Sequence, residues 1–341
     1  MTDVNIINLR SDTFTRPGAG MYEAMAAAPV GDDVYGEDET VNALEVMASE
    51  LLGKQAGLFL SSATQANLVA VLVHCGRGEE VLLGEGYHIF QHEAGGASAL
   101  GGVVVHPLST NATGGLSIEQ VVGAIKADDF HNPITRLLSL ENTVSGHLQD
   151  PEHHRLLAET VRDRGLKVHL DGARLMNAAV ALGIPPADIC APFDSAMLCL
   201  SKGLGAPVGA MLCGQTEFIR KARRLRKMLG GGMRQAGIIA ACGIYALDNN
   251  VERLAQDHAN ARRLAEGISS IDNLDVEVAT NMVFIRPAPE DHEPLREFLA
   301  ARQILFGDQR PTMRLVTHLD IGARDIERVI AEIQNYFEHR A

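Results

Sequence analysis

The sequence predicts an α/β protein: a large domain with a mostly parallel sheet, followed by a small α+β domain at the C-terminus. Up to about residue 214, short apolar segments alternate with helical patterns, which is typical of a parallel sheet covered by helices on both faces. Longer helical stretches then replace this alternation, and short strands and a terminal helix follow. We therefore expect a large domain over residues 1–245 and a small domain over 246–341.

The elements are expected in the following order. Residues 56–60 (AGLFL) are a predicted strand, and residues 64–75 have the apolar spacing of a helix. Further strands are expected at 80–84, 103–108, 136–140, 167–170, 195–200 and 209–213, with helices between most of them. After these we expect helices over 215–228, 235–247 and 250–269, strands over 282–286 and 313–316, and a final helix over 323–338.

Composition and charge exclude several classes of protein. The chain has 341 residues, of which 46% are apolar and 21% charged, as in a globular protein. A formal net charge of −13 argues against binding to nucleic acids or anionic membranes. Neither a secretory signal nor an apolar stretch of about 20 residues occurs, so we expect a cytoplasmic protein. The five cysteines have no CxxC spacing, so we expect reduced thiols and no metal site.

Polar residues directly follow five of the predicted strands. In open α/β sheets, ligands bind at the carboxyl ends of the strands, so these residues predict a binding site at one edge of the sheet. The segments, in chain order, are SSATQAN, GEGYHIFQHEAGG, ENTVSG, DGAR and SKGLGAPVG.

Two of these strand ends carry a lysine and an aspartate. Lys202 in a glycine-rich turn would ordinarily extend its amine into solvent, and Asp171 would ordinarily cap a helix. A lysine that can form a Schiff base and a carboxylate facing a ring nitrogen are, however, what pyridoxal 5′-phosphate (PLP) needs. The helix start near Thr64 suits either a phosphate or plain capping. His88 suits either a helix start or stacking on a cofactor ring.

Motifs spread over about residues 6–338 resemble those of the low-specificity L-threonine aldolases. The resemblance implies fold type I, the aspartate-aminotransferase fold, with PLP as cofactor. It also implies retro-aldol cleavage of L-threonine, L-allo-threonine and related L-3-hydroxy amino acids to glycine and an aldehyde. The motifs that carry it are INLRSDTFTRP, PVGDDVYGEDETVNALE, LVHCGRGEE, LSLENT, HLDGAR, CLSKGLGAPVG, RKMLGGGMRQ, TNMVF and MRLVTHLD.

The resemblance also implies contacts to the cofactor. Lys202 resembles the Schiff-base lysine, Asp171 matches the partner of the pyridine nitrogen, and His88 matches the histidine that stacks on the ring. Ala63 and Thr64 match the phosphate cradle. The remaining cofactor contacts are expected from Arg174, Ser201 and Arg234.

For the substrate, Arg314 matches the main clamp of the carboxylate, where a planar bidentate donor fits. Arg174 and Ser11 match further substrate contacts. Lys227 and Arg234 match residues that the family brings to the site, with Arg234 from a neighbouring subunit. We therefore expect a homo-oligomer, a homotetramer with active sites shared across a dimer interface. The basic run 220–228 is then partly functional rather than only a solvated helix face.

Three positions depart from the family pattern. Ala63 stands where a glycine is usual, which is tolerable if its φ is negative. Val144 replaces a histidine that normally contacts the substrate β-hydroxyl, and valine transfers no proton. His92 stands where many members carry an aromatic residue, four residues after His88. It either replaces the missing imidazole in catalysis or is a polar residue of the pocket wall.

Val144 leaves other reactions open on the same scaffold. Without the histidine that senses the hydroxyl, the protein could be a PLP-dependent racemase or a β-eliminating lyase. A protein of this fold that only binds is a third alternative, and Lys202, Asp171 and the two arginines argue against it.

Overall fold

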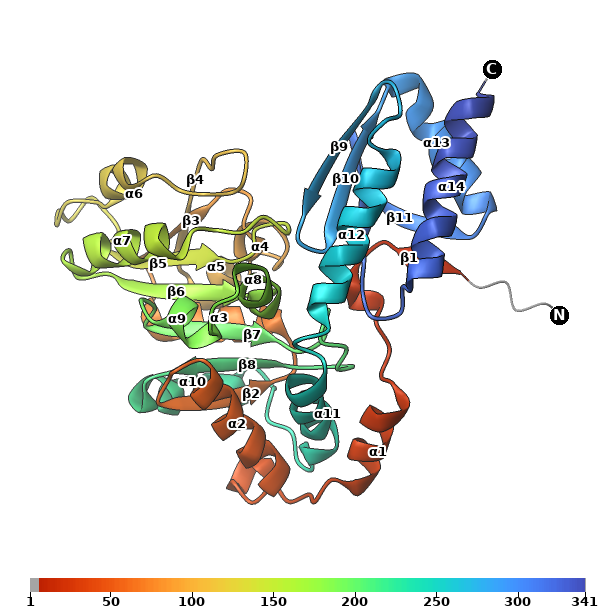
Figure 1. Ribbon diagram of the computed structural model, residues 1–341. Helices are drawn as coiled ribbons and strands as arrows, with labels where there is room; N and C mark the ends of the chain where they lie inside the picture. The colour runs from red at the N-terminus through yellow and green to blue at the C-terminus, as the bar shows by residue number, and fades with distance from the viewer. Residues whose placement is uncertain (1–5, 341) are drawn as a thin grey trace.

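The computed structural model describes residues 6–340 and contains a large parallel-type sheet (Figure 1). Its strands are β2 (Ala56–Leu60), β3 (Glu80–Gly84), β4 (Val104–Leu108), β5 (Thr135–Glu141), β6 (Lys167–Gly172), β7 (Ser195–Cys199) and β8 (Ala210–Gly214). They lie in the order β2-β8-β7-β6-β5-β3-β4. Only β8 runs antiparallel to its neighbours. The predicted fold class is thereby confirmed.

Helices cover both faces of this sheet because both faces are apolar. In β2, Leu58 and Leu60 join a buried cluster with α3 (Ala63–His74) and α10 (Thr216–Met228). Phe59, which points the other way, joins the cluster that contains α2 (Glu39–Leu51). The other helices around the sheet are α1 (Ala19–Ala27), α4 (His88–Gln91), α5 (Gly96–Gly101), α6 (Ile118–Ala124), α7 (Pro151–Arg162), α8 (Leu175–Leu182), α9 (Pro186–Cys190) and α11 (Gly237–Asn249), with 3₁₀ turns η1 (Asp12–Phe14) and η2 (Asp33–Tyr35).

A second, five-stranded sheet forms the C-terminal region with α12 (Leu254–Ile268), α13 (Pro289–Ala301) and α14 (Ala323–His339). Its strands are β9 (Leu274–Ala279), β10 (Met282–Pro287), β11 (Ile304–Gln309), β12 (Thr312–Val316) and the N-terminal β1 (Ile7–Leu9). Their order is β1-β11-β12-β10-β9. The sequence analysis did not predict β1, β9, β11 or α13.

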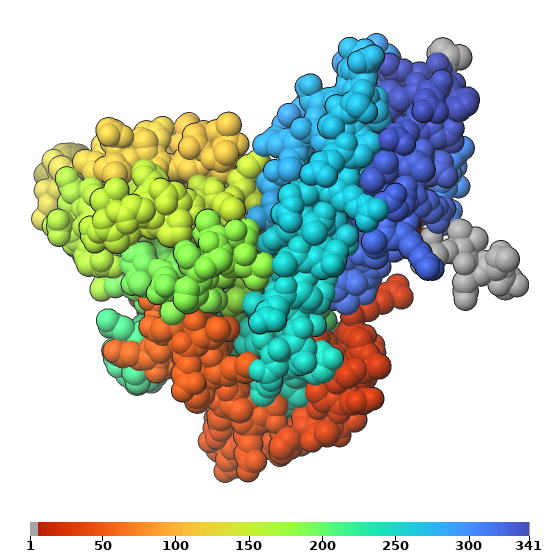
Figure 2. All heavy atoms as spheres, in the orientation of Figure 1, coloured from red at the N-terminus to blue at the C-terminus, as the bar shows by residue number. Residues whose placement is uncertain are grey.

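The N-terminal strand belongs to this C-terminal sheet. β1 pairs parallel with β11, with Ile7 opposite Ile304, and Ile7 and Leu9 are fully buried in the core of the second region. The expected boundary between residues 245 and 246 falls inside α11, and this division stays a prediction. In Figure 2 a notch separates the yellow and yellow-green surface of the first region from the blue surface of the second. Within residues 6–340, no helix combines the length and the apolar character needed to cross a membrane.

Candidate active site

The carboxyl edge of the large sheet gathers several of the predicted site residues. Asp171 is the penultimate residue of strand β6, Arg174 caps the start of α8, and His88 opens α4 after β3. Lys202 follows β7, and its backbone oxygen accepts a hydrogen bond from Thr15 Oγ1 over 2.9 Å. The positive charge of Lys202 also contributes to the lowered pKa of the buried Asp12 carboxyl and opposes the rise in the pKa of the buried Glu141 carboxyl at this edge. These side chains therefore share one site.

One side of the site, which we call the acidic side, contains the carboxyls of Asp171, Glu93 and Glu141. Asp171 is buried and accepts hydrogen bonds from the Ala173 backbone N–H over 2.9 Å and from Asn67 Nδ2 over 2.7 Å. The same Asn67 nitrogen donates to Glu93 Oε1 over 2.8 Å. These bonds fix the orientation of both carboxyls with neutral donors.

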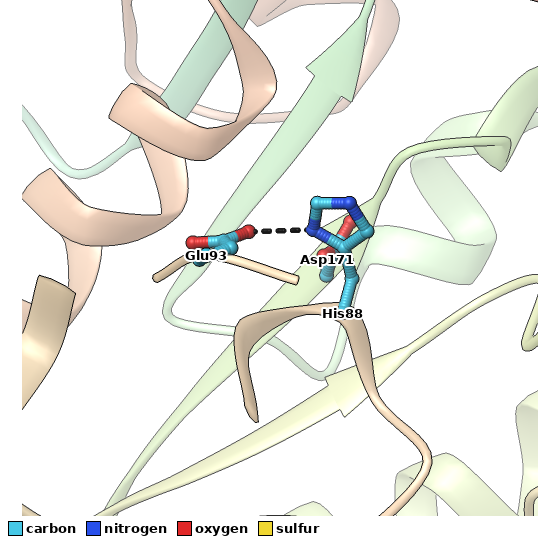
Figure 3. A group of neighbouring side chains, drawn as sticks. All are labelled: His88, Glu93 and Asp171. Carbon is cyan, nitrogen blue, oxygen red and sulfur yellow. Dashed lines mark hydrogen bonds and ion pairs between the residues drawn. The ribbon is translucent and has the colours of Figure 1, made fainter. Parts of the chain in front are cut away.

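His88 completes the acidic side. Figure 3 shows its ring beside Asp171, with Nδ1 directed at Glu93 Oε1, 2.8 Å away. One ligand atom from each of the three residues lies within 4.8 Å of the other two, a spacing that a metal ion could use. The oxygens nearest to His88 already accept N–H groups of Asn67, which would point at such an ion. The expectation of no metal site stays a prediction.

On the acidic side, the carboxyl groups have no basic side chain among the described residues that would balance all of them. Burial and the charge of Asp171 raise the pKa of Glu141 to about 8, although its Oε2 accepts the backbone N–H of His88 over 2.8 Å. Burial also raises the pKa of Glu93. Within residues 6–340, Asp171 has no ion pair with a basic side chain. A protonated ring nitrogen is a cation that would fit this buried carboxylate.

The opposite side, the arginine side, contains Arg174, Arg314 and the carboxyl of Asp12. Arg174 binds both oxygens of Asp12, over 2.7 and 2.8 Å, and Asn281 Nδ2 donates to Asp12 over 3.3 Å. Burial would raise the pKa of Asp12, but the charge and hydrogen bonds of Arg174 outweigh burial and lower that pKa to about 2. Arg174 therefore uses its Nε and Nη2 donors on Asp12.

Arg314 has donors left over. Its Nη2 donates to the backbone oxygen of Arg10 over 3.3 Å, whereas its Nε is buried without a partner among the described residues. Burial and the charge of Arg174 lower its pKa. A buried guanidinium N–H without a partner costs free energy that a carboxylate ligand would recover. Within the described residues both predicted clamps keep donors, Nε of Arg314 and Nη1 of Arg174, and only the donor of Arg314 is buried without a partner.

The predicted phosphate cradle forms the start of α3. Ser62 caps the helix and accepts the Gln65 backbone N–H over 3.1 Å, and Ala63 and Thr64 are its first two residues. The backbone of Ala63 is helical, so its φ is negative and the exchange of glycine for alanine causes no strain at this position. The helix start offers further N–H groups to an anion. Ser201, also predicted to contact the cofactor, has Oγ 3.6 Å from Cys199 Sγ.

The two histidines of α4 lie together, as their spacing predicts. The rings of His88 and His92 are 5.5 Å apart, and the pKa of His92 is lowered by burial and by the charges of His88 and Arg314. Val144 is buried in the turn after β5, two residues after Asn142, whose backbone N–H donates to the Asp171 backbone oxygen over 3.1 Å. A Cβ at Gly114 would lie 2.4 Å from Val144 Cγ1, so this side chain packs on the loop before α6.

Three predicted residues lie outside this cluster of contacts. Ser11 caps η1, next to Asp12, and accepts the Thr13 backbone N–H over 3.2 Å. Arg234 pairs with Asp32 over 2.8 Å, and Lys227 lies beside Gly232 near the C-terminal end of α10. No hydrogen bond or ion pair of the described chain joins Lys227 or Arg234 to Lys202.

The sequence analysis did not predict several polar residues that organise the site. Asp12, Asn67, Glu93 and Glu141 are all buried there. All four stand within segments that were singled out for other residues, LRSD, SSATQAN, GEGYHIFQHEAGG and ENTVSG. For Asp12 and Glu93, a charged side chain immediately beside a predicted ligand was the available signal, but the partners were not visible in the sequence.

Comparisons with known proteins agree with this geometry. The sequence model of a family described as Beta-eliminating lyase matches residues 8–289. A low specificity L-threonine aldolase of Escherichia coli (strain K12) is 50% identical over 96% of this chain and 98% of its own length. A probable low-specificity L-threonine aldolase of Arabidopsis thaliana is 41% identical over 98% of both chains. The solved structure of a threonine aldolase from Leishmania major has the same fold, with a TM-score of 0.82, 22% identity, and coverage of 97% of this chain and 99% of that one.

Proposed function

Because this chain belongs to the β-eliminating lyase family, and within it to the low-specificity L-threonine aldolases, we propose that its site cleaves L-3-hydroxy amino acids. L-Threonine and L-allo-threonine would each give glycine and acetaldehyde. The observation that carries this proposal is a site that combines a buried carboxylate, Asp171, with a buried guanidinium N–H of Arg314 that has no partner among the described residues. The enzyme is an aldehyde-lyase that depends on PLP.

The residues present fit PLP. Asp171, held by neutral donors, would accept a hydrogen bond from the protonated ring nitrogen, and the start of α3 with Ala63 and Thr64 would hold the phosphate. Lys202 would hold the aldehyde carbon, and His88 would lie on the ring. When bound, the cofactor supplies an electron sink for the pair of electrons released from the Cα–Cβ bond.

The arginine side would orient the substrate. Arg314 would bind the substrate carboxylate through its unpartnered N–H, and the Asp12–Arg174 pair would hold the second positive charge in place. A fixed carboxylate sets which bond of Cα faces the electron sink, and so decides between cleavage, racemisation and β-elimination. The relatives favour cleavage over the two alternatives.

Cleavage needs a base for the β-hydroxyl proton. The substrate O–H loses its proton, the Cα–Cβ bond breaks, the aldehyde leaves, and a proton returns to Cα to give glycine. We assign the proton transfer to the imidazoles of His88 and His92. With Nδ1–H of His88 donated to Glu93, its Nε2 keeps a lone pair, and the lowered pKa of His92 keeps that ring neutral and able to accept a proton.

We also propose a cytoplasmic homotetramer. Large apolar side chains are exposed close to the residues expected at a subunit interface: Tyr35 is 76% and Met228 74% exposed. Lys227 and Arg234 lie beside this surface, where a second copy of the chain could receive them. The five cysteines are free and buried, which suits a reducing compartment.

The proposal is tested by measuring glycine and aldehyde released from L-threonine, L-allo-threonine and L-phenylserine, with L-serine and L-alanine as controls. We expect equal amounts of glycine and aldehyde from the 3-hydroxy amino acids. Racemised L-alanine or ammonia from L-serine, without aldehyde from any substrate, would replace the aldolase with one of the alternatives.

A further inference from the structure

A buried chain of hydrogen bonds leads away from Asp171 through the core. Asn67 Nδ2 donates to Asp171 Oδ2 over 2.7 Å, and Asn67 Oδ1 lies 3.2 Å from His169 Nε2. His169 Nδ1 lies 2.8 Å from Ser195 Oγ, which lies 2.8 Å from His74 Nε2. Five side chains thus connect the candidate active site to the far end of α3.

The fold places these residues in line. Asn67 and His74 are about two turns apart on α3, so they share a helix face. His169 and Asp171 are alternate residues of β6 and point to the same face of the sheet, and Ser195 of β7 lies directly opposite His169. The relay of hydrogen bonds therefore runs between helix α3 and the two central strands, β6 and β7.

His169 and His74, the two histidines of this hydrogen-bond relay, are neutral near pH 7. Burial lowers the pKa of His169 to about 3 and that of His74 to about 4. For His74 the nearby charge of Asp194 opposes this shift, and Lys167 and Lys221 add to it. Each ring consequently has one N–H and one lone pair, and can donate only on one side.

These protonation states fix the donor and the acceptor in each hydrogen bond of the relay. The carboxylates of Asp171 and Glu93 accept both Asn67 N–H groups, so the Asn67 oxygen must accept Nε2–H of His169. The lone pair on His169 Nδ1 then accepts the Ser195 hydroxyl, whose oxygen accepts Nε2–H of His74. Every donor points toward Asp171.

We propose that His74, Ser195 and His169 are positioning residues that hold the Asn67 amide toward Asp171 and so stabilise the negative charge of this carboxylate. Donors aimed at a carboxylate favour its charged form, and a relay of aligned donors strengthens each bond. The inference rests on the proposed function, because it concerns the carboxylate that would face the ring nitrogen of PLP. None of the three residues touches substrate or cofactor.

The outer end of the relay is open to solvent. His74 stacks on Phe218, with ring centroids 4.7 Å apart, and lines a hollow of about 270 Å³ together with Lys167, Asp194 and Lys221. Replacement of His74 by phenylalanine preserves an aromatic ring on Phe218 and removes only the N–H that Ser195 accepts.

The chain offers a matched control for Ser195. Ser139 lies on β5 directly opposite His169, on the other side from Ser195, and is equally buried. Its hydroxyl has no partner among the described residues. Ser195→Ala and Ser139→Ala therefore remove the same atom from neighbouring strands, but only the first interrupts the relay.

The experiment compares Ser195→Ala, Ser139→Ala and His74→Phe with the parent enzyme. Three quantities are measured: kcat and KM for L-threonine, the dissociation constant of PLP, and the pH midpoint of the visible absorbance of the loaded protein. For Ser195→Ala we expect kcat to fall about three- to tenfold with little change in KM, and PLP to bind more weakly. Its absorbance midpoint should move to higher pH, because a more basic Asp171 shares the ring proton. His74→Phe should shift in the same direction by less.

An unchanged absorbance midpoint and PLP affinity in both Ser195→Ala and His74→Phe would overturn the relay. So would equal changes in Ser195→Ala and Ser139→Ala, which would indicate packing alone. If Ser195→Ala fails to fold, the absorbance midpoint and PLP affinity of His74→Phe, at the solvent end of the relay, decide whether the proposal stands. A parent protein that binds PLP but cleaves no 3-hydroxy amino acid would refute the proposed function, while PLP affinity and absorbance would still test the relay.

Discussion

The two sides of the site hold a buried carboxylate in opposite ways. On the arginine side, Asp12 forms an ion pair with Arg174, so the two charges neutralise each other and the geometry of the pair is fixed. On the acidic side, Asp171 is matched only by neutral N–H donors, so its full charge remains for a ligand. One side is organised to present a cation to the substrate carboxylate, and the other to present an anion to a protonated ring nitrogen. The difference lies in the partners, not in the carboxyl groups.

Lys202→Ala is the substitution with the largest expected effect. The charge of Lys202 influences the pKa of a carboxyl on each side of the site, Asp12 and Glu141. We expect loss of nearly all turnover and of the visible absorbance of the loaded protein. Borohydride reduction of the parent followed by peptide mapping should place the label on Lys202. Absorbance like that of the parent in the variant would exclude the assignment.

Asp171→Asn breaks the acidic side alone. The amide keeps the shape but cannot balance a protonated ring nitrogen, so we expect kcat to fall about 10²- to 10³-fold while PLP still binds. Steady-state kinetics with measured PLP occupancy test this. An undiminished kcat at full occupancy would show that another group, such as Glu141, balances the ring.

Acid titration tests the arginine side. Because the pKa of Asp12 is lowered to about 2, its contribution to stability is present above pH 4 and is lost as the pH falls toward 2. The contribution is about 2 kcal/mol, from the distance between the ordinary pKa and the lowered one. Urea unfolding of the parent and of Asp12→Asn between pH 5 and 2.5 should show the steeper loss in the parent. Parallel curves would mean that Arg174 does not hold Asp12 ionised.

Val144→His gives the smallest expected effect and sharpens the role of His92. Val144 packs on Gly114, whereas His92 lies beside His88, so we expect Val144→His to change cleavage only a few-fold and His92→Phe to cost up to about 10²-fold. The rates for L-threonine and L-allo-threonine measure both variants and their combination. A large gain from Val144→His alone would return the hydroxyl contact to position 144.

The sequence predicted the residues that stand alone at strand ends but not their partners. Asp171, Arg174 and Lys202 follow apolar strands, and the parallel topology that brings such ends together could be inferred from the alternation of elements. The pairing of Arg174 with Asp12 joins the start of α8 to the 3₁₀ turn η1 after β1, and Asn67 reaches Asp171 from a helix. Such contacts depend on three-dimensional packing, which no local spacing encodes.

The same limit explains the missed strands. β1 is three residues long, too short for an alternating pattern, and its position is set by burial of Ile7 and Leu9 against β11. β9 carries exposed and half-buried residues along most of its length, so it lacks the apolar signal of the central strands. Edge strands of a small sheet are defined by their neighbours more than by their own composition.

The pairing of β1 with β11 also has a consequence for biosynthesis. β1 leaves the ribosome well before its partner, residues 304–309, has been made. Asp12 stands just after β1, so the Asp12–Arg174 pair can be fixed in place only after β11 has been made. Contacts of such long sequence separation form late and slowly. The nascent enzyme can thus fold its large sheet before β11 is made, and it becomes able to hold a substrate carboxylate only afterwards.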